Sequence, residues 1–105
     1  MFAAIYSFKV KPNQTESFEK AWEDLTRLIY QFEGSLGSRL HKSDALNYIA
    51  YAQWPDKNTW ENSGKKLPDT ANEIRQIMKE ACDKIETVYT LDAVTDLLMD
   101  KSFAK

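Results

Sequence analysis

The chain has little of the residue types on which several structural classes depend. It contains one cysteine, one histidine, three glycines and three prolines among 105 residues. A lone Cys82 cannot form an internal disulfide, which excludes a disulfide-stapled fold and agrees with a reducing compartment. One histidine and one cysteine are too few for a soft-ligand metal site within one protomer, and the carboxylates show no recognised ligand spacing. We therefore expect no metal.

The sequence also lacks an excess of charge of one sign and any long apolar run. Fourteen basic residues face sixteen acidic ones, for a net charge of -2, and no segment gathers enough Lys and Arg to neutralise a run of phosphates. Nucleic acid is therefore excluded as a partner. No apolar stretch approaches the roughly 20 residues that span a bilayer, and Met1 leads directly into Phe2 without the basic start of a signal peptide. These absences predict a cytoplasmic protein with no membrane partner.

What the chain does have is a large apolar and aromatic content. Hydrophobic residues make up 43% of the sequence and aromatic residues 12%, which at this length suits one globular domain with a modest core. We expect a single domain over residues 1–105, with its core at about 3–94 and a C-terminal tail over 95–105. Because the tail retains Leu97, Leu98, Met99 and Phe103, it is predicted to dock on another surface.

The hydrophobic pattern predicts six main elements and one short helix. Residues 2–10 are typical of a strand, and apolar residues at spacings of three and four predict a helix from Gln14 to Gly34, with Asn13 and Glu16 as a capping box. Two strands over 36–42 and 47–54 predict a hairpin. A short helix over 57–63, capped by Asp56, is followed by a helix from Thr70 and a strand over 85–94. The stripe of the first long helix comprises Phe18, Ala21, Trp22, Leu25, Leu28, Ile29 and Phe32, and that of the second comprises Ile74, Ile77, Met78, Ala81 and Cys82.

This order of strand, helix, strand, strand, helix, strand is the split βαβ pattern of an α+β, ferredoxin-like βαββαβ sandwich with an antiparallel sheet. Two helices cover one face of such a sheet and leave the other bare. The strands over 2–10 and 47–54 are apolar on both faces, so the bare face would expose a large apolar area. A homodimer with sheet facing sheet, a dimeric α+β barrel, removes that exposure.

A known family shares these features. The element order, the stretch GSLGSRLH over 34–41 and the stretch YAQWP over 51–55 followed by Trp60 together resemble the antibiotic biosynthesis monooxygenase family. The likeness covers about residues 3–94, and its most specific part is the hairpin with its Ala-Gln-Trp-Pro exit. The resemblance implies a homodimer with a pocket between sheet and helices in each protomer.

The resemblance also implies a choice of activities. Some members oxygenate phenols or quinols with dioxygen and no cofactor, others degrade haem, and many have no assigned reaction. The haem-degrading members use an Asn on the first strand and a His on the last helix; here residues 1–10 contain no Asn and the helix from Thr70 no His. We therefore expect a cofactor-free monooxygenase that acts on a small aromatic molecule, such as a phenol or quinol, and dioxygen. The alternative is a non-catalytic dimer of the same fold that binds a small ligand.

His41 is the first candidate for a catalytic residue. An imidazole accepts a proton near neutral pH and would suit a phenolic substrate; the alternative is a strand residue at the sheet edge or the dimer seam. Arg39 shares its strand face and would bind an anionic phenolate or carboxylate, or else form an ion pair between subunits. If Ser43 pairs with Leu46, His41 lies opposite Tyr48 and Arg39 opposite Ala50. This pairing puts Arg39, His41, Tyr48 and Trp54 on one face of the sheet, and a change of one residue in the loop would reverse the facing of Arg39 and His41.

Four aromatic residues are the remaining candidates for substrate binding. Tyr6, Tyr51, Trp54 and Trp60 would line a pocket for a planar molecule. The alternative is that these side chains are simply core. Cys82 lies on an apolar stripe and is expected to be a buried, inert thiol.

Overall fold

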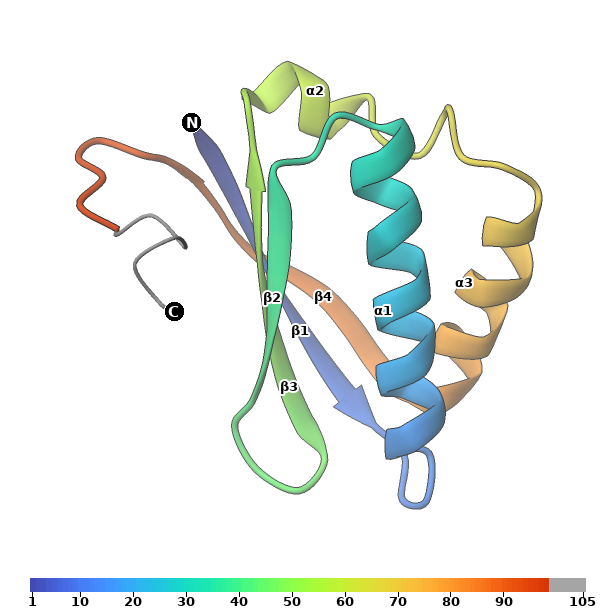
Figure 1. Ribbon diagram of the computed structural model, residues 1–105. Helices are drawn as coiled ribbons and strands as arrows, with labels where there is room; N and C mark the ends of the chain where they lie inside the picture. Colours follow the sequence, from blue (N-terminus) through green and yellow to red (C-terminus); the bar gives the residue numbers. More distant parts are fainter. Residues whose placement is uncertain (99–105) are drawn as a thin grey trace, which may run out of the picture.

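The computed structural model describes residues 1–98. A four-stranded antiparallel sheet carries two long helices on one face (Figure 1). In chain order the elements are β1 (Phe2–Val10), α1 (Thr15–Phe32), β2 (Gly37–Lys42), β3 (Asn47–Trp54), α2 (Lys57–Glu61), α3 (Thr70–Ala81) and β4 (Cys82–Asp92). The strand order is β2-β3-β1-β4, which confirms the predicted ferredoxin-like α+β fold.

The core lies between the helices and the sheet. Along β3, every second residue from Tyr48 to Trp54 is buried, and the residues between them are only partly buried. This is the period of two expected of a strand that covers a core with one face. The ring of Phe18 on α1 lies 5.0 Å from that of Phe8 and 4.8 Å from that of Tyr48, centre to centre. These three rings hold α1 against the middle of the sheet.

Tyr48 also makes a polar contact with α1. Its side chain is 2% exposed, and its hydroxyl donates a hydrogen bond to Glu19 Oε2 at 2.5 Å. Burial, together with this hydrogen bond and the negative charge of Glu19, raises the pKa of Tyr48 to about 12. The phenol therefore stays protonated and serves as a donor that fixes the first turns of α1 above β3.

The start of α1 differs from the prediction. The residue before the helix is Gln14, which makes no side-chain capping hydrogen bond, and Asn13 adopts a positive φ of 66° in the turn that precedes it. The predicted capping box is therefore wrong, because Asn13 is used as a turn residue with left-handed backbone. At the other end Gly34, with φ of 79°, follows the helix as predicted. Phe32, assigned to the apolar stripe, is 41% exposed.

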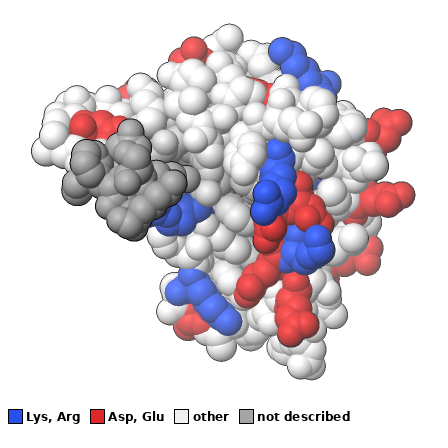
Figure 2. Space-filling view, viewed as in Figure 1, with Lys and Arg blue, Asp and Glu red and all other residues white. Residues whose placement is uncertain are grey.

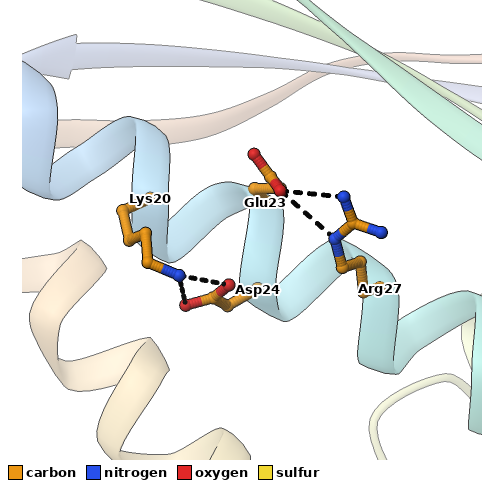
Figure 3. A network of polar contacts seen from close by, with 4 residues as sticks. All are labelled: Lys20, Glu23, Asp24 and Arg27. Atoms are coloured by element: carbon orange, nitrogen blue, oxygen red, sulfur yellow. Dashed lines mark hydrogen bonds and ion pairs between the residues drawn. The ribbon is translucent and has the colours of Figure 1, made fainter.

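The outer face of α1 carries both acidic and basic side chains, so positive and negative charges lie beside one another there. Lys20 pairs with Asp24 and Arg27 pairs with Glu23, each across one helical turn (Figure 3). Figure 2 shows acidic and basic side chains beside one another on the face that carries α1. Such alternation is typical of a solvated helix surface.

The helix α3 and the strand β4 also differ from their predicted bounds. Cys82 is the first residue of β4, not part of α3, although it is buried as predicted. Burial raises the pKa of its thiol to about 11, which keeps it protonated and unreactive. Ile77, predicted for the buried stripe of α3, is 49% exposed.

The sheet face opposite the helices is open, and the segment 93–98 passes beside it (Figure 1). One row crosses all four strands on this face: Arg39 pairs with Tyr51, Tyr51 with Ile5, and Ile5 with Tyr89. Leu97 and Leu98 are largely exposed, and Met99 and Phe103, which were also predicted to dock, lie outside the described residues. Across residues 1–98, no helix has the length and apolar character needed to cross a membrane.

Candidate functional site

Three of the predicted site residues meet on the helix face, at one end of the sheet. Trp54 pairs with Phe2 across β3 and β1, and Tyr6 lies on the same face of β1, four residues further along. Asp56 caps α2 by accepting a hydrogen bond from the backbone of Thr59 at 2.7 Å, and this cap brings the next residue, Trp60, back over the sheet. We call Phe2, Tyr6, Trp54 and Trp60 the aromatic cluster.

Two direct contacts fix Trp60 in the aromatic cluster. Its indole Nε1 donates a hydrogen bond to the Tyr6 hydroxyl at 2.7 Å. Its ring lies 5.4 Å from the ring of Phe2, at an angle of 39° between planes, within the range typical of tilted aromatic pairs. The short helix α2 is thereby attached to the start and the middle of β1, at Phe2 and Tyr6.

The cluster presents two polar hydrogens to its apolar surroundings. Burial raises the pKa of Tyr6 above its usual value, and the hydrogen bond from Trp60 opposes this rise; the phenol is therefore neutral and keeps its hydrogen. Trp54 is 3% exposed, and its indole Nε1 is buried with no hydrogen-bond partner within the described part of the chain. A buried donor without an acceptor is costly, so an acceptor from ordered water or from a bound molecule is expected at this position.

Three other predicted residues, Arg39, His41 and Tyr51, lie on the opposite face of the sheet. In the hairpin, Lys42 pairs with Tyr48 and His41 with Ile49, so the predicted pairing of His41 with Tyr48 is wrong by one residue. Arg39 accordingly pairs with Tyr51, where Ala50 was predicted. These residues face away from the helices because neighbouring strand positions point to opposite faces.

The loop between β2 and β3 explains the change of register, because Ser43 lies opposite Asn47 with three residues, 44–46, between them, where a two-residue turn was predicted. Asp44 Oδ1 accepts backbone hydrogen bonds from Leu46 and Asn47, both at 3.1 Å. Ser43 N–H bonds to the carbonyl of Asn47 at 2.9 Å. Asp44 thus mimics one backbone turn inside the loop, and β3 begins one residue later relative to β2 than a two-residue turn would allow.

The predicted residues therefore form two groups, one on each face of the sheet. Arg39 and Tyr51 border an open hollow of about 280 Å³ beside the segment 93–98, together with Leu36, Gly37, Ser38, Gln53, Asp96 and Leu98. His41 is exposed further along β2. A molecule held in the aromatic cluster cannot touch His41 of the same protomer, because the sheet lies between them. No group of three His, Cys, Asp or Glu side chains within residues 1–98 is placed to hold a metal ion.

Sequence reasoning omitted two residues of the helix-face site. Phe2 was assigned only to a strand, although it shares its alternation with Tyr6 and so lies on the same face. Glu33 was not considered, because an acidic residue at a helix end is usually solvated. It is instead 7% exposed, and its carboxylate binds the loop that follows α2.

Comparison with known proteins identifies the family. The model of the antibiotic biosynthesis monooxygenase family matches residues 1–66, more than half of the chain, and the chain therefore belongs to that family. No curated protein matches the sequence. Among solved structures, the chain is similar to SnoaB, a cofactor-independent oxygenase from Streptomyces nogalater, with 13% identity over 91% of this chain and 95% of that one and a TM-score of 0.74.

Two further structures share the fold. A protein from Caulobacter crescentus, described as a candidate antibiotic biosynthesis monooxygenase, is 22% identical over 90% of each chain, with a TM-score of 0.72. Rv0793 from Mycobacterium tuberculosis is 10% identical over 92% of this chain and 98% of that one, also with a TM-score of 0.72. At these identities the structures establish a common architecture.

Proposed function

We propose that the protein is a cofactor-independent monooxygenase that oxidises a small phenol-like or quinol-like molecule at the aromatic cluster. The observation that carries the proposal is the aromatic cluster, in which the buried indole N–H of Trp54 has no partner within residues 1–98 and Trp60 is bonded to the hydroxyl of Tyr6. Membership of the monooxygenase family supports it, as does the likeness to SnoaB, which is a cofactor-independent oxygenase.

The proposed reaction needs no external reductant. A phenol with a free para carbon reacts with dioxygen to give a quinone and water: one oxygen atom joins the ring, the other leaves as water, and the substrate supplies all four electrons. Dioxygen is a triplet and reacts slowly with closed-shell molecules, so the substrate must first give up one electron. A phenolate does this far more readily than a phenol.

In this proposal the residues of the cluster favour the phenolate and hold it in place. The hydroxyl hydrogen of Tyr6 and the indole hydrogen of Trp54 are donors that would bind the phenolate oxygen, and donors in a dry site stabilise a negative charge strongly. The substrate loses its proton to solvent on binding, so the cluster needs no base. The rings of Phe2 and Trp60 would cover its plane, exclude water and fix its orientation.

A role for His41 stays a separate prediction. It requires a site on the open face, where Arg39 and Tyr51 border a hollow and Arg39 would bind an anionic substrate. We favour the aromatic cluster because its donors are buried within the protomer, whereas a dry environment around the exposed His41 would depend on a second copy that covers the open face.

The rival function is a binding module with the same site and no chemistry. The test is dioxygen consumption in the presence of 1-naphthol and a panel of other phenols and quinols, each corrected for oxidation without protein. An oxygenase consumes dioxygen and forms the quinone in equal amounts; a binding module only raises its melting temperature. Trp54→Phe keeps the ring but removes the N–H, and should lower the rate about 10²-fold; Trp22→Phe is the matched control. Absence of consumption with every compound would overturn the proposal.

A further inference from the structure

We infer that Glu33 is a positioning residue of the helix-face site: its carboxylate holds the loop after α2 and thereby keeps Trp60 against Tyr6. The inference rests on the proposed function for what the site binds, but the contacts that carry it are independent of any reaction. Glu33 directly follows α1, and α2 lies near that end of the helix (Figure 1).

The carboxylate of Glu33 acts as an acceptor for two backbone groups. Its Oε2 accepts hydrogen bonds from the N–H of Gly64 at 2.7 Å and from the N–H of Lys66 at 2.9 Å. A buried carboxylate is rare in proteins unless it is paired, and hydrogen bonds to an ionised group are stronger than those between neutral groups. The loop 64–66 is therefore fastened to the end of α1.

A short series of bonds connects this fastening to Trp60. The backbone carbonyl of Trp60 accepts hydrogen bonds from Ser63 Oγ at 2.6 Å and from Ser63 N–H at 3.1 Å. Gly64 follows immediately and donates to Glu33. The backbone at Trp60 is thus held from its C-terminal side, while its indole is held by Tyr6.

Apart from the contacts of Trp60 with Tyr6 and Phe2, α2 has few buried contacts with the rest of the protein. The helix contains five residues, and none of them is buried. Its start depends on the capping bond that Asp56 Oδ1 accepts from the backbone N–H of Thr59. A helix with so few buried contacts opens locally at a low free-energy cost, so the bonds of Glu33 weigh heavily in where Trp60 lies.

The sequence at Gly64 is suited to this contact. Its φ is 97°, and a Cβ placed there would come within 3.1 Å of Arg75 Nη2. Glycine therefore allows the left-handed turn of the loop, which places the Gly64 N–H toward Glu33, and leaves room for the Arg75 side chain.

The test is hydrogen exchange of the Trp60 indole N–H in ¹⁵N-labelled full-length protein, with its resonance assigned from Trp60→Phe. Glu33→Ala should speed this exchange by at least about tenfold while the Trp22 indole stays within about twofold. Glu33→Gln retains an acceptor oxygen and should stay within about threefold of wild type. Glu73→Ala, an exposed glutamate on α3, is the matched control.

Every outcome decides the question. Unchanged exchange of Trp60 in Glu33→Ala would overturn the inference, and so would equal acceleration of all three indoles, which would mean a general loss of stability. If Glu33→Ala does not fold, Ser63→Ala removes one bond of the same series and should speed exchange of Trp60 selectively, with no selective effect counting against the inference.

The exchange readout also separates this inference from the proposed function. Selective exchange without any dioxygen consumption in wild type would keep Glu33 as a positioning residue and remove the oxygenase. Consumption of dioxygen with 1-naphthol, but with no selective exchange in Glu33→Ala, would keep the oxygenase and remove Glu33 as a positioning residue.

Discussion

Trp60 and Tyr6, which are 54 residues apart in sequence, are joined by a hydrogen bond of 2.7 Å from the indole nitrogen to the phenol oxygen. Because Tyr6 accepts this bond, its own hydrogen stays available for donation to a ligand, and its raised pKa keeps that hydrogen in place at neutral pH. The pair connects the short helix α2 to the central strand β1 and defines the polar part of the proposed site.

Removing the hydroxyl of Tyr6 tests its role as a donor. Tyr6→Phe should lower the rate of dioxygen consumption with 1-naphthol by about 10- to 10³-fold, because one donor to the developing anion is lost. The free energy of unfolding should fall by only about 1 kcal/mol. Tyr30→Phe, at an exposed tyrosine of α1, is the control. Equal rates for Tyr6→Phe and wild type would remove Tyr6 from the reaction.

His41 provides a test between the two faces of the sheet. If the aromatic cluster is the site, His41→Ala should keep the oxygenation rate within about twofold of wild type. If His41 is instead the base, the rate should fall about 10²–10⁴-fold. Sedimentation of the variant must accompany the assay, since a lost dimer would point to a structural role for this side chain.

The hairpin shows where sequence reasoning reached its limit. The two strands, their antiparallel pairing and their place in the fold followed from alternation and turn residues, because those signals are local. The facing of Arg39 and His41 depended on whether the closing pair of the hairpin encloses two or three residues, and it is decided by hydrogen bonds from Leu46 and Asn47 to the Asp44 side chain. A polar loop sequence allows both lengths, and one residue reverses the face.

The helix-face site was predictable only in part. Tyr6, Trp54 and Trp60 were named as pocket residues from their aromatic character, and they do lie together. Glu33 was missed because its partners are backbone groups of a loop some thirty residues later. No side-chain pattern in the sequence marks a contact of that kind.

The core contact of α1 predicts a ranking of two substitutions. Phe18 is fully buried between Phe8 and Tyr48, so Phe18→Ala should lower the free energy of unfolding by about 3–5 kcal/mol. Trp22 is only partly buried against the same core, so Trp22→Ala should cost less, about 2–3 kcal/mol. Urea unfolding of both variants checks the order. A larger loss for Trp22→Ala would mean that its ring is covered in solution.

Tyr48 predicts a loss of stability at alkaline pH. Its pKa is raised to about 12 in the folded protein, above about 10 in the unfolded chain, so its contribution is complete below pH 10 and is lost as pH rises toward 12. Tyr48→Phe should therefore be less stable at pH 8 by about 1–2 kcal/mol. The difference from wild type should shrink between pH 10 and 12. A constant difference over this range, measured by urea unfolding, would contradict the assigned cause.

The open face of the sheet predicts a homodimer that buries it. Ile5 lies at the centre of this face, paired with Tyr51 on one side and Tyr89 on the other, and Tyr89 is 59% exposed in the protomer. An apolar row of this kind is seldom left in water, and a second copy covers it with the same surface. Sedimentation velocity at micromolar concentration should give a dimer for wild type and for Ile5→Val, and a folded monomer for Ile5→Glu, because a carboxylate facing its own copy would be buried without a partner. A wild-type monomer at that concentration, or a stable dimer in Ile5→Glu, would place any interface elsewhere.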